Sequence, residues 1–133
     1  MNTQTMPRFL TEKEVLEIHN SQTQLFGGAA DLRDDGLLRS AVATPQASFG
    51  GNFLYADIFE MAAAYWISIV GNHPFADGNK RTGAMSAAVF LELNNHEFII
   101  DEDVFIDAVL RSAQGLLSVP AAASLLRNNC LPR

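Results

Sequence analysis

Ten consecutive residues carry most of the side chains in this chain that could do chemistry. The segment reads His73-Pro74-Phe75-Ala76-Asp77-Gly78-Asn79-Lys80-Arg81-Thr82. An imidazole can take a proton from a hydroxyl near neutral pH, which makes His73 the candidate general base. A carboxylate is a hard oxygen ligand that Mg²⁺ takes together with phosphate oxygens and water, so Asp77 is the candidate metal ligand.

The second half of the segment is typical of a phosphate site. Gly78 and Asn79 stand where a helix should begin, so that backbone N–H groups and the helix dipole favour an anion there. Lys80 and Arg81 add two cations. We therefore predict that Gly78, Asn79, Lys80 and Arg81 bind phosphate. Phe75 cannot do chemistry, and we expect its ring to be buried between helices and to position the loop.

Each of these residues also has an ordinary structural explanation. Asp-Gly-Asn is a common turn, Asn79 is a good N-cap, and a histidine at a helix end often acts as a cap. A purely structural turn does not need an imidazole, a carboxylate, an amide and two cations in one short segment, so the combination favours a functional site. Among other nucleotide and metal motifs, G-x-x-x-x-G-K-[ST], G-x-G-x-x-G and H-E-x-x-H are absent.

The elements that must position this segment are predicted to be helices. Apolar residues recur at three- and four-residue steps from Asp57 to about Asn72 and again from Asn79 to Asn94. The chemical segment would then connect two central antiparallel helices. Four further helices are predicted from capping and apolar patterns, at 11–24, 35–43, 101–112 and 118–129. Residues 45–56 look irregular, and 96–100 could form a short strand-like connection. We expect an all-α bundle of about six helices.

Length and composition set further bounds. The 133 residues fit a single domain, 1–133, and 48% hydrophobic with 18% charged residues indicates a folded protein. A single cysteine, Cys130, excludes an intrachain disulfide and suits a reducing cytoplasm. No apolar run approaches the roughly 20 residues that a bilayer span needs, so no membrane contact is expected.

The charge distribution argues against direct nucleic-acid binding. The net charge is -6, and no Lys or Arg occurs between Gly83 and Leu110, where six acidic residues accumulate. They are Glu92, Glu97, Asp101, Glu102, Asp103 and Asp107. This surface could be simply solvated, or it could receive a basic segment of a partner.

The segment as a whole resembles the signature loop of the Fic superfamily. The pattern is His73-x-Phe75-x-Asp77-Gly78-Asn79-x-Arg81, and Lys80 after Asn79 is the mark of the death-on-curing (Doc) branch. Other segments resemble Doc proteins as well: Ile18-His19 through Phe26-Gly27-Gly28, Leu32-Arg33-Asp34-Asp35-Gly36-Leu37-Leu38, Pro45-Gln46 with Phe49-Gly50-Gly51, and Phe90-Leu91 with Leu93-Asn94. The similarity covers most of residues 11–100. His19 is expected to be a packed histidine of the first helix, and its role stays open.

The resemblance implies an all-helical transferase that uses ATP and Mg²⁺. His73 would deprotonate a hydroxyl of a target protein, the loop would bind the nucleotide phosphates, and Asp77 would help to hold the metal. Most Fic enzymes transfer AMP. This sequence differs from them in two ways, because Lys80 replaces the usual glycine and Ala84 replaces a second arginine that clamps the nucleotide.

At both positions the sequence resembles the Doc branch. This resemblance implies transfer of the terminal phosphate of ATP to a Ser or Thr of a target protein. The resemblance favours translation elongation factor Tu as the target and implies the toxin of a toxin-antitoxin pair. The inhibitory motif [S/T]-x-x-x-E-[G/N] of many Fic proteins is absent. Inhibition would come from a separate antitoxin with a flexible tail. Adenylyl transfer and a catalytically inactive Fic-like binding module remain the alternatives.

Overall fold

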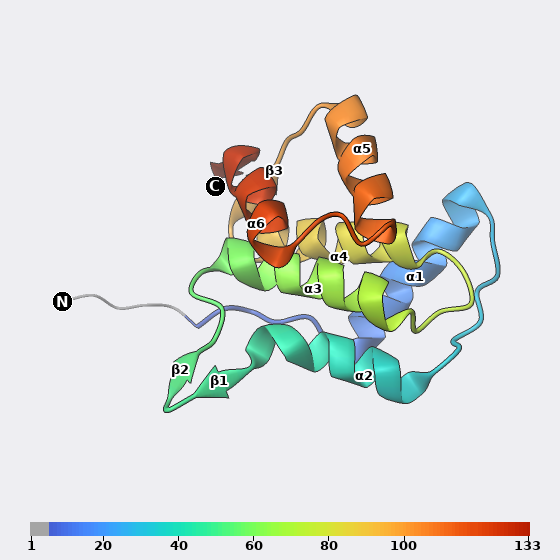
Figure 1. Cartoon of the computed structure of the whole chain (residues 1–133), viewed down its shortest axis with the longest axis horizontal. Helices are drawn as coiled ribbons and strands as arrows, with labels where there is room; N and C mark the ends of the chain where they lie inside the picture. Colours follow the sequence, from blue (N-terminus) through green and yellow to red (C-terminus); the bar gives the residue numbers. More distant parts are fainter. Residues whose placement is uncertain (1–5) are drawn as a thin grey trace.

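The computed structural model describes residues 6–133, and it is built almost entirely from helices (Figure 1). The six α-helices are α1 Glu12–Phe26, α2 Asp35–Ala43, α3 Ile58–Asn72, α4 Asn79–Leu93, α5 Glu102–Ala113 and α6 Val119–Asn128. The all-α prediction is confirmed. Each predicted helix is present, and most bounds differ from prediction by one residue, although α1 continues two residues further, to Phe26.

Helix starts follow from polar residues that satisfy free backbone N–H groups. The Thr11 hydroxyl accepts from Glu14 N, and the Glu14 carboxylate accepts from Thr11 N, which completes a capping box on α1. Asp34, Asp57, Asp101 and Ser118 cap α2, α3, α5 and α6 with their side chains. These local signals explain why the helix starts could be predicted from sequence.

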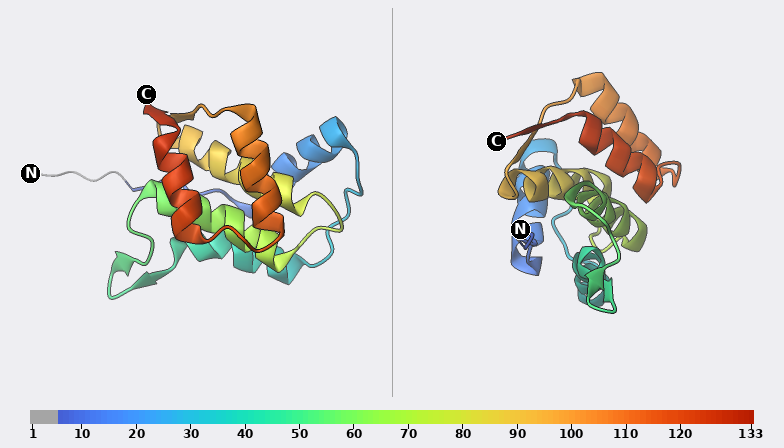
Figure 2. Two further views of the ribbon diagram at one scale, coloured as in Figure 1. Left: turned by 45° about the horizontal axis from the view of Figure 1, so that its top comes forward. Right: turned by 90° about the vertical axis from the view of Figure 1, so that its left-hand side faces the viewer.

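Helix α3 is the centre of the fold. It packs against α2 on one side and α4 on another, with α5 and α6 above it in Figure 1 and α1 behind α4 (Figures 1 and 2). Its residues Met61–Trp66 are all buried. A Cβ at Gly83 of α4 would lie 2.8 Å from the Trp66 carbonyl oxygen, so the close approach of α3 and α4 requires glycine there.

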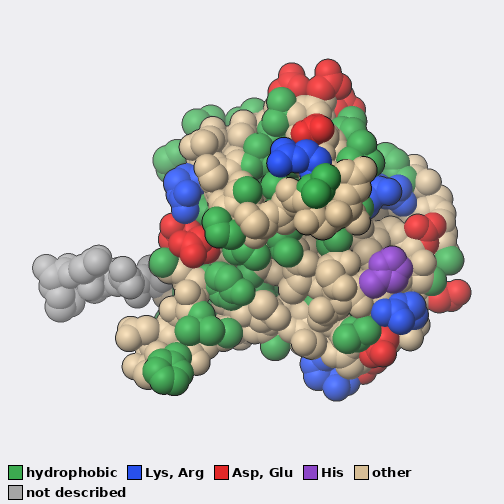
Figure 3. Space-filling model, in the orientation of Figure 1, with side chains coloured by type: hydrophobic (Ala, Val, Ile, Leu, Met, Phe, Trp, Pro, Cys, Tyr) green, Lys and Arg blue, Asp and Glu red, His purple; other side chains and the backbone are tan. Residues whose placement is uncertain are grey.

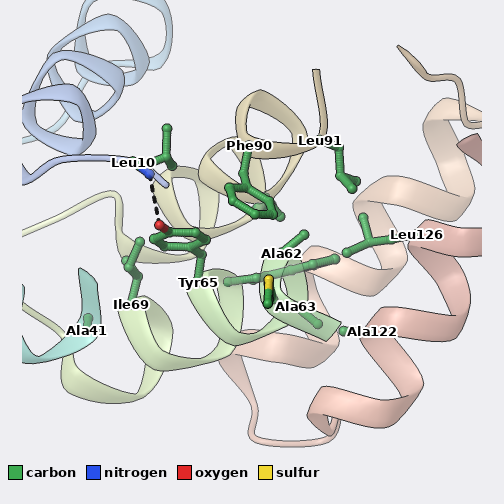
Figure 4. Packing of buried hydrophobic residues seen from close by; sticks show 14 of the residues in the cluster. Leu10, Ala41, Ala62, Ala63, Tyr65, Ile69, Phe90, Leu91, Ala122 and Leu126 are labelled. Atoms are coloured by element: carbon green, nitrogen blue, oxygen red, sulfur yellow. Dashed lines mark hydrogen bonds between the residues drawn. The ribbon is translucent and has the colours of Figure 1, made fainter. Parts of the chain in front are cut away.

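Tyr65 connects the core to the chain segment that enters α1. Its hydroxyl oxygen accepts a hydrogen bond from Leu10 N at 2.9 Å, and both residues are buried beside Phe90 (Figure 4). Burial raises the pKa of the Tyr65 hydroxyl above its ordinary value. The bond satisfies a backbone donor that would otherwise be buried without a partner.

Two small antiparallel pairs of strands complete the structure. β1 Ser48–Phe49 pairs with β2 Asn52–Phe53 inside residues 45–56, which were expected to be irregular. The short 3₁₀ helix Thr44–Gln46 precedes β1. β3 His96–Phe98, expected as a strand-like connection, pairs with β4 Cys130–Pro132, which the sequence did not predict. The C-terminal residues are thereby attached to the end of α4.

The surface agrees with the charge pattern of the sequence. Asp and Glu side chains gather over the start of α5, at the top of the face drawn in Figure 3. The six acidic residues between 92 and 107 are all exposed. Within residues 6–133, no helix combines the length and apolar character needed to cross a bilayer.

Candidate active site

The connection between α3 and α4 forms one wall of a pocket of about 200 Å³. Its lining contains seven residues of the predicted chemical segment together with one residue of α3 and one at the end of α5. The lining residues are Val70, His73, Ala76, Asp77, Gly78, Asn79, Lys80, Arg81 and Ala113. The structure therefore brings all the polar candidates of the sequence to one cavity.

His73 follows the last residue of α3 in a left-handed conformation. Its φ and ψ are 52° and 54°, and its backbone N–H bonds to the Ile69 carbonyl at 3.0 Å. A non-glycine residue rarely adopts this conformation unless its surroundings fix it. Arg33 supplies part of that constraint, because its Nε donates to the His73 carbonyl at 2.8 Å and its Nη2 to the Asn72 carbonyl at 3.2 Å. The imidazole is left exposed at the pocket.

The loop is closed by the side chain of Asn79. Its Oδ1 accepts from Phe75 N at 3.0 Å and its Nδ2 donates to Phe75 O at 2.9 Å, both in a buried environment. Phe75 itself is fully buried and stacks on His19 with a centroid separation of 3.7 Å. Since its amide is used on both sides by Phe75, Asn79 offers phosphate mainly its backbone N–H. Its role in phosphate binding stays a prediction.

The start of α4 differs from that of the other described α-helices, which all have a side-chain cap. Its N-cap is Gly78, in a left-handed conformation (φ 80°), and no side chain of residues 6–133 bonds to the free N–H groups of the first turn. The first turn contains no acidic residue either. A helix start without a cap, beside Lys80 and Arg81, has backbone donors and positive potential available for an anion.

Asp77 is exposed at the pocket and oriented by its own loop. Its Oδ1 accepts from Gly78 N at 2.8 Å, while its backbone carbonyl is 2.8 Å from Nε2 of buried His19. A Cβ on Gly28 would lie 2.5 Å from Oδ2, so a larger residue at position 28 would displace this carboxylate from its present position. Residues 6–133 contain no group of three or more His, Cys, Asp or Glu arranged to hold a metal. One carboxylate fits Mg²⁺ held jointly with nucleotide phosphates.

Arg81 belongs to the first turn of α4, and its side chain contacts the end of α1. Its Nη2 lies 3.4 Å from the Gly27 carbonyl, and its guanidinium carbon is 5.1 Å from the centroid of the Phe26 ring. Its Nε is buried and has no hydrogen-bond partner among residues 6–133. A buried guanidinium donor without an acceptor is costly, so this site has unused capacity for an anionic oxygen.

A strand-like contact holds the loop from the other side. Leu32 and Phe75 form an antiparallel bridge, and the N–H groups of Arg33 and Asp34 donate to the Pro74 carbonyl at 2.7 and 3.0 Å. Ala76 N donates to the Asp31 carbonyl at 2.9 Å. The backbone of residues 74–76 is therefore fixed by the segment that leads into α2.

An apolar groove of about 430 Å³ adjoins the pocket. Lys80 and Arg81 contribute to both cavities, and most of the other lining residues of the groove are apolar side chains of α1, α4 and α5, several of them exposed. They include Leu25, Phe26, Ile106 and Leu110. The polar pocket thus opens beside an apolar surface.

Two contributors to the loop were not assigned a role from sequence. Arg33 and His19 lie within segments that resemble Doc proteins, but helical or turn patterns carry no sign that either side chain reaches residues 72–77. Their contacts span 40 and 58 positions along the chain. The resemblance of those segments was the one available signal, and it could identify the positions without giving their roles.

Comparisons with known proteins find a matching family model and relatives of similar sequence. The family model described as Fic/DOC family matches residues 9–91, which includes the whole chemical segment. Toxin Doc of Mycolicibacterium smegmatis (strain ATCC 700084 / mc(2)155) is 39% identical over 99 residues, covering 74% of each chain. Protein kinase doc of Escherichia phage P1 is 29% identical over 120 residues, covering 90% of this chain and 94% of the relative.

Proposed function

Because this chain belongs to the Fic/DOC family, we propose that it is a toxin that transfers the terminal phosphate of ATP to a Ser or Thr hydroxyl of a target protein. The observation that carries the proposal is the uncapped start of α4, which faces one pocket together with His73, Asp77 and Lys80. Two relatives bear the names Toxin Doc and Protein kinase doc, which supports both halves of the proposal.

The chain's own groups account for the steps of the reaction. His73 takes the proton of the target hydroxyl, whose oxygen attacks the terminal phosphorus. The bond from that phosphorus to the bridging oxygen breaks, and ADP leaves with the electron pair. Backbone N–H groups at the start of α4 and the cations of Lys80 and Arg81 stabilise charge on the phosphate oxygens. Asp77 would help to hold Mg²⁺, which would supply positive charge to the phosphate oxygens.

The choice of phosphate over adenylyl transfer rests on two positions. Lys80 places a four-carbon side chain and a cation at the first turn of α4, where the wider family has glycine. The side chain fills space in the pocket beside the free backbone N–H groups of that turn. Ala84, where a second nucleotide-binding arginine is usual, is buried and has no polar group to offer. Both features favour a nucleotide whose terminal phosphate, and not its α-phosphate, faces His73.

The target that the family resemblance favours is elongation factor Tu, and labelled ATP tests this directly. The purified chain is incubated with the factor and ATP labelled at either the α- or the γ-phosphate, with His73→Ala as the control. We expect γ-label alone on the factor and a mass increase of one phosphoryl group. A whole adenylyl group on the target would replace the proposal by adenylyl transfer. Nucleotide binding without transfer to any protein would favour the inactive module.

Inhibition is proposed to come from a separate antitoxin. The groove beside Lys80 and Arg81 is apolar, and the acidic first turn of α5 adjoins it, so a flexible segment with apolar and basic side chains would complement it. We expect co-expression of such an antitoxin to restore growth in cells arrested by this chain. Replacing Ile106 by Asp in the groove should weaken that rescue while leaving phosphate transfer intact, because Ile106 is half-exposed and absent from the pocket.

A further inference from the structure

His19 is a buried polar side chain that the proposed reaction does not use. It lies in the middle of α1 and is 1% exposed, yet its Nε2 reaches the backbone carbonyl of Asp77 at 2.8 Å. Because a carbonyl oxygen only accepts, Nε2 must carry a proton in this contact. The ring also stacks almost parallel on Phe75, at 5° and 3.7 Å. Helix α1 thus contacts the loop through a donor and a flat face.

The bonded carbonyl belongs to the peptide group between Asp77 and Gly78. The N–H of this same planar group donates to Oδ1 of Asp77 at 2.8 Å. Holding the carbonyl therefore fixes the direction of the N–H, and the N–H in turn orients the carboxylate. Gly78 has a φ of 80° and no Cβ, so without the bond from His19 this peptide group would have little resistance to rotation.

We propose that His19 is a positioning residue that fixes the Asp77–Gly78 peptide and so aims the Asp77 carboxylate at the metal and phosphates. This inference rests on the proposed function for its ligand, Mg²⁺ with ATP, but its geometric part concerns this chain alone. His19 would act like the residues that hold a metal ligand in place by hydrogen bonds without touching the metal. Loss of such a residue typically lowers metal affinity or activity by about 10- to 100-fold.

Two amide variants separate the donor from the rest of the side chain. In His19→Gln the amide nitrogen stands as far along the side chain as Nε2, so it can reach the Asp77 carbonyl. In His19→Asn the same group is one methylene shorter and cannot. Val15→Ala removes a buried side chain one turn earlier on α1 without touching the loop, and it controls for lost packing.

The first measurement needs no ligand. Amide hydrogen exchange of Gly78 is compared with that of Phe90, a buried residue of α4 that reports general opening of the helix. We expect the ratio of the two exchange rates to rise about tenfold in His19→Asn and to stay near wild type in His19→Gln and Val15→Ala. Equal ratios in the two amide variants would overturn the proposal.

The second measurement uses Mg²⁺ and a non-hydrolysable ATP analogue in a thermal-shift titration. The half-saturating Mg²⁺ concentration should rise about tenfold in His19→Asn and change little in His19→Gln. An exchange difference with no thermal response to Mg²⁺ and nucleotide in the wild type would support the positioning of the peptide and overturn the proposed function. If His19→Asn does not fold, ¹⁵N NMR of the wild-type imidazole decides, since an unprotonated Nε2 contradicts the proposal.

Discussion

The first turns of α1 and α4 both have backbone N–H groups without a partner inside the helix, and the two starts treat these groups in opposite ways. At α1, Thr11 and Glu14 bond each other's backbone N–H groups, and Arg8 holds the outer face of Glu14. At α4 the N-cap is a glycine, no side chain of residues 6–133 caps the turn, and the charged residues within the turn are the cations Lys80 and Arg81. The start of α1 is therefore closed by its own side chains, which stabilises the fold, whereas the start of α4 keeps its backbone donors available to an anion.

The largest expected effect is the loss of the base at the open helix start. His73→Ala should lower phosphate transfer by about 10²- to 10⁴-fold, because no other side chain of the pocket can accept the hydroxyl proton as readily near neutral pH. The melting temperature should hardly change, since the imidazole is exposed. Transfer rates are measured with γ-labelled ATP and the melting temperature by circular dichroism. His96→Ala is the control, and wild-type transfer by His73→Ala would disprove the assignment.

Removing the cation next to the open turn should have a smaller effect. Lys80→Gly is expected to lower transfer by about 10²-fold, as for the loss of a single group that stabilises transition-state charge. Glycine also weakens the helix, so Lys80→Gln is needed to separate the loss of charge from the loss of helix propensity. Lys13→Gln, at an exposed position of α1, is the matched control. Single-turnover rates give the comparison. If both Lys80 variants transfer as fast as wild type, the reaction needs no cation at position 80, and the role assigned to Lys80 is wrong.

Breaking the closed helix start should affect stability and not chemistry. Thr11→Ala removes the cap of α1 and should cost about 1 kcal/mol of unfolding free energy, read from chemical denaturation. Transfer per folded molecule should stay at the wild-type level, and Thr11→Ser should restore stability. A drop in transfer with unchanged stability would mean that the two helix starts do not divide their roles as described.

The smallest effect concerns the acid sensitivity of the same closed turn. The hydrogen bonds from Arg8, the larger cause, and from Thr11 lower the pKa of Glu14 from its ordinary 4.5 to about 2. The ionised carboxylate therefore stabilises the fold above pH 4.5, and this contribution is lost as the pH falls from 4.5 towards 2. The difference in melting temperature between wild type and Glu14→Gln should shrink across that range. Glu17→Gln, also on α1, serves as control, and a constant difference would contradict the coupling.

The same comparison explains what the sequence could and could not reveal. Helix starts depend on neighbours within four residues, so Thr11, Asp34 and Ser118 marked their helices without any tertiary information. The β1–β2 hairpin was missed because two-residue strands around Gly50-Gly51 are too short to show alternation. β4 was missed because it contains a proline, and its partner β3 lies more than 30 positions away.

The candidate site divides in the same manner. The polar residues from His73 to Arg81 lie within one short segment, so their types and spacing could be read directly from the sequence. The contacts that fix them come from Arg33 and His19, whose distances to the loop are set by how α1 and α2 pack. The two hydrogen bonds from the Asn79 side chain to the backbone of Phe75 were not predicted. An asparagine at the expected start of a helix is interpreted first as its N-cap, and the sequence gives no sign that the side chain bonds four residues back.

The separation between the loop and its anchors along the chain bears on the order of folding. Helices α3 and α4 are consecutive, and the Asn79–Phe75 clamp closes over four residues, so this hairpin can form at small loop-closure entropy. The bond from His19 to the Asp77 carbonyl closes over 58 residues and becomes possible only when α1 docks. We therefore expect the pocket to take shape before its carboxylate is aimed, so that a newly made chain gains its chemistry at the last step of folding.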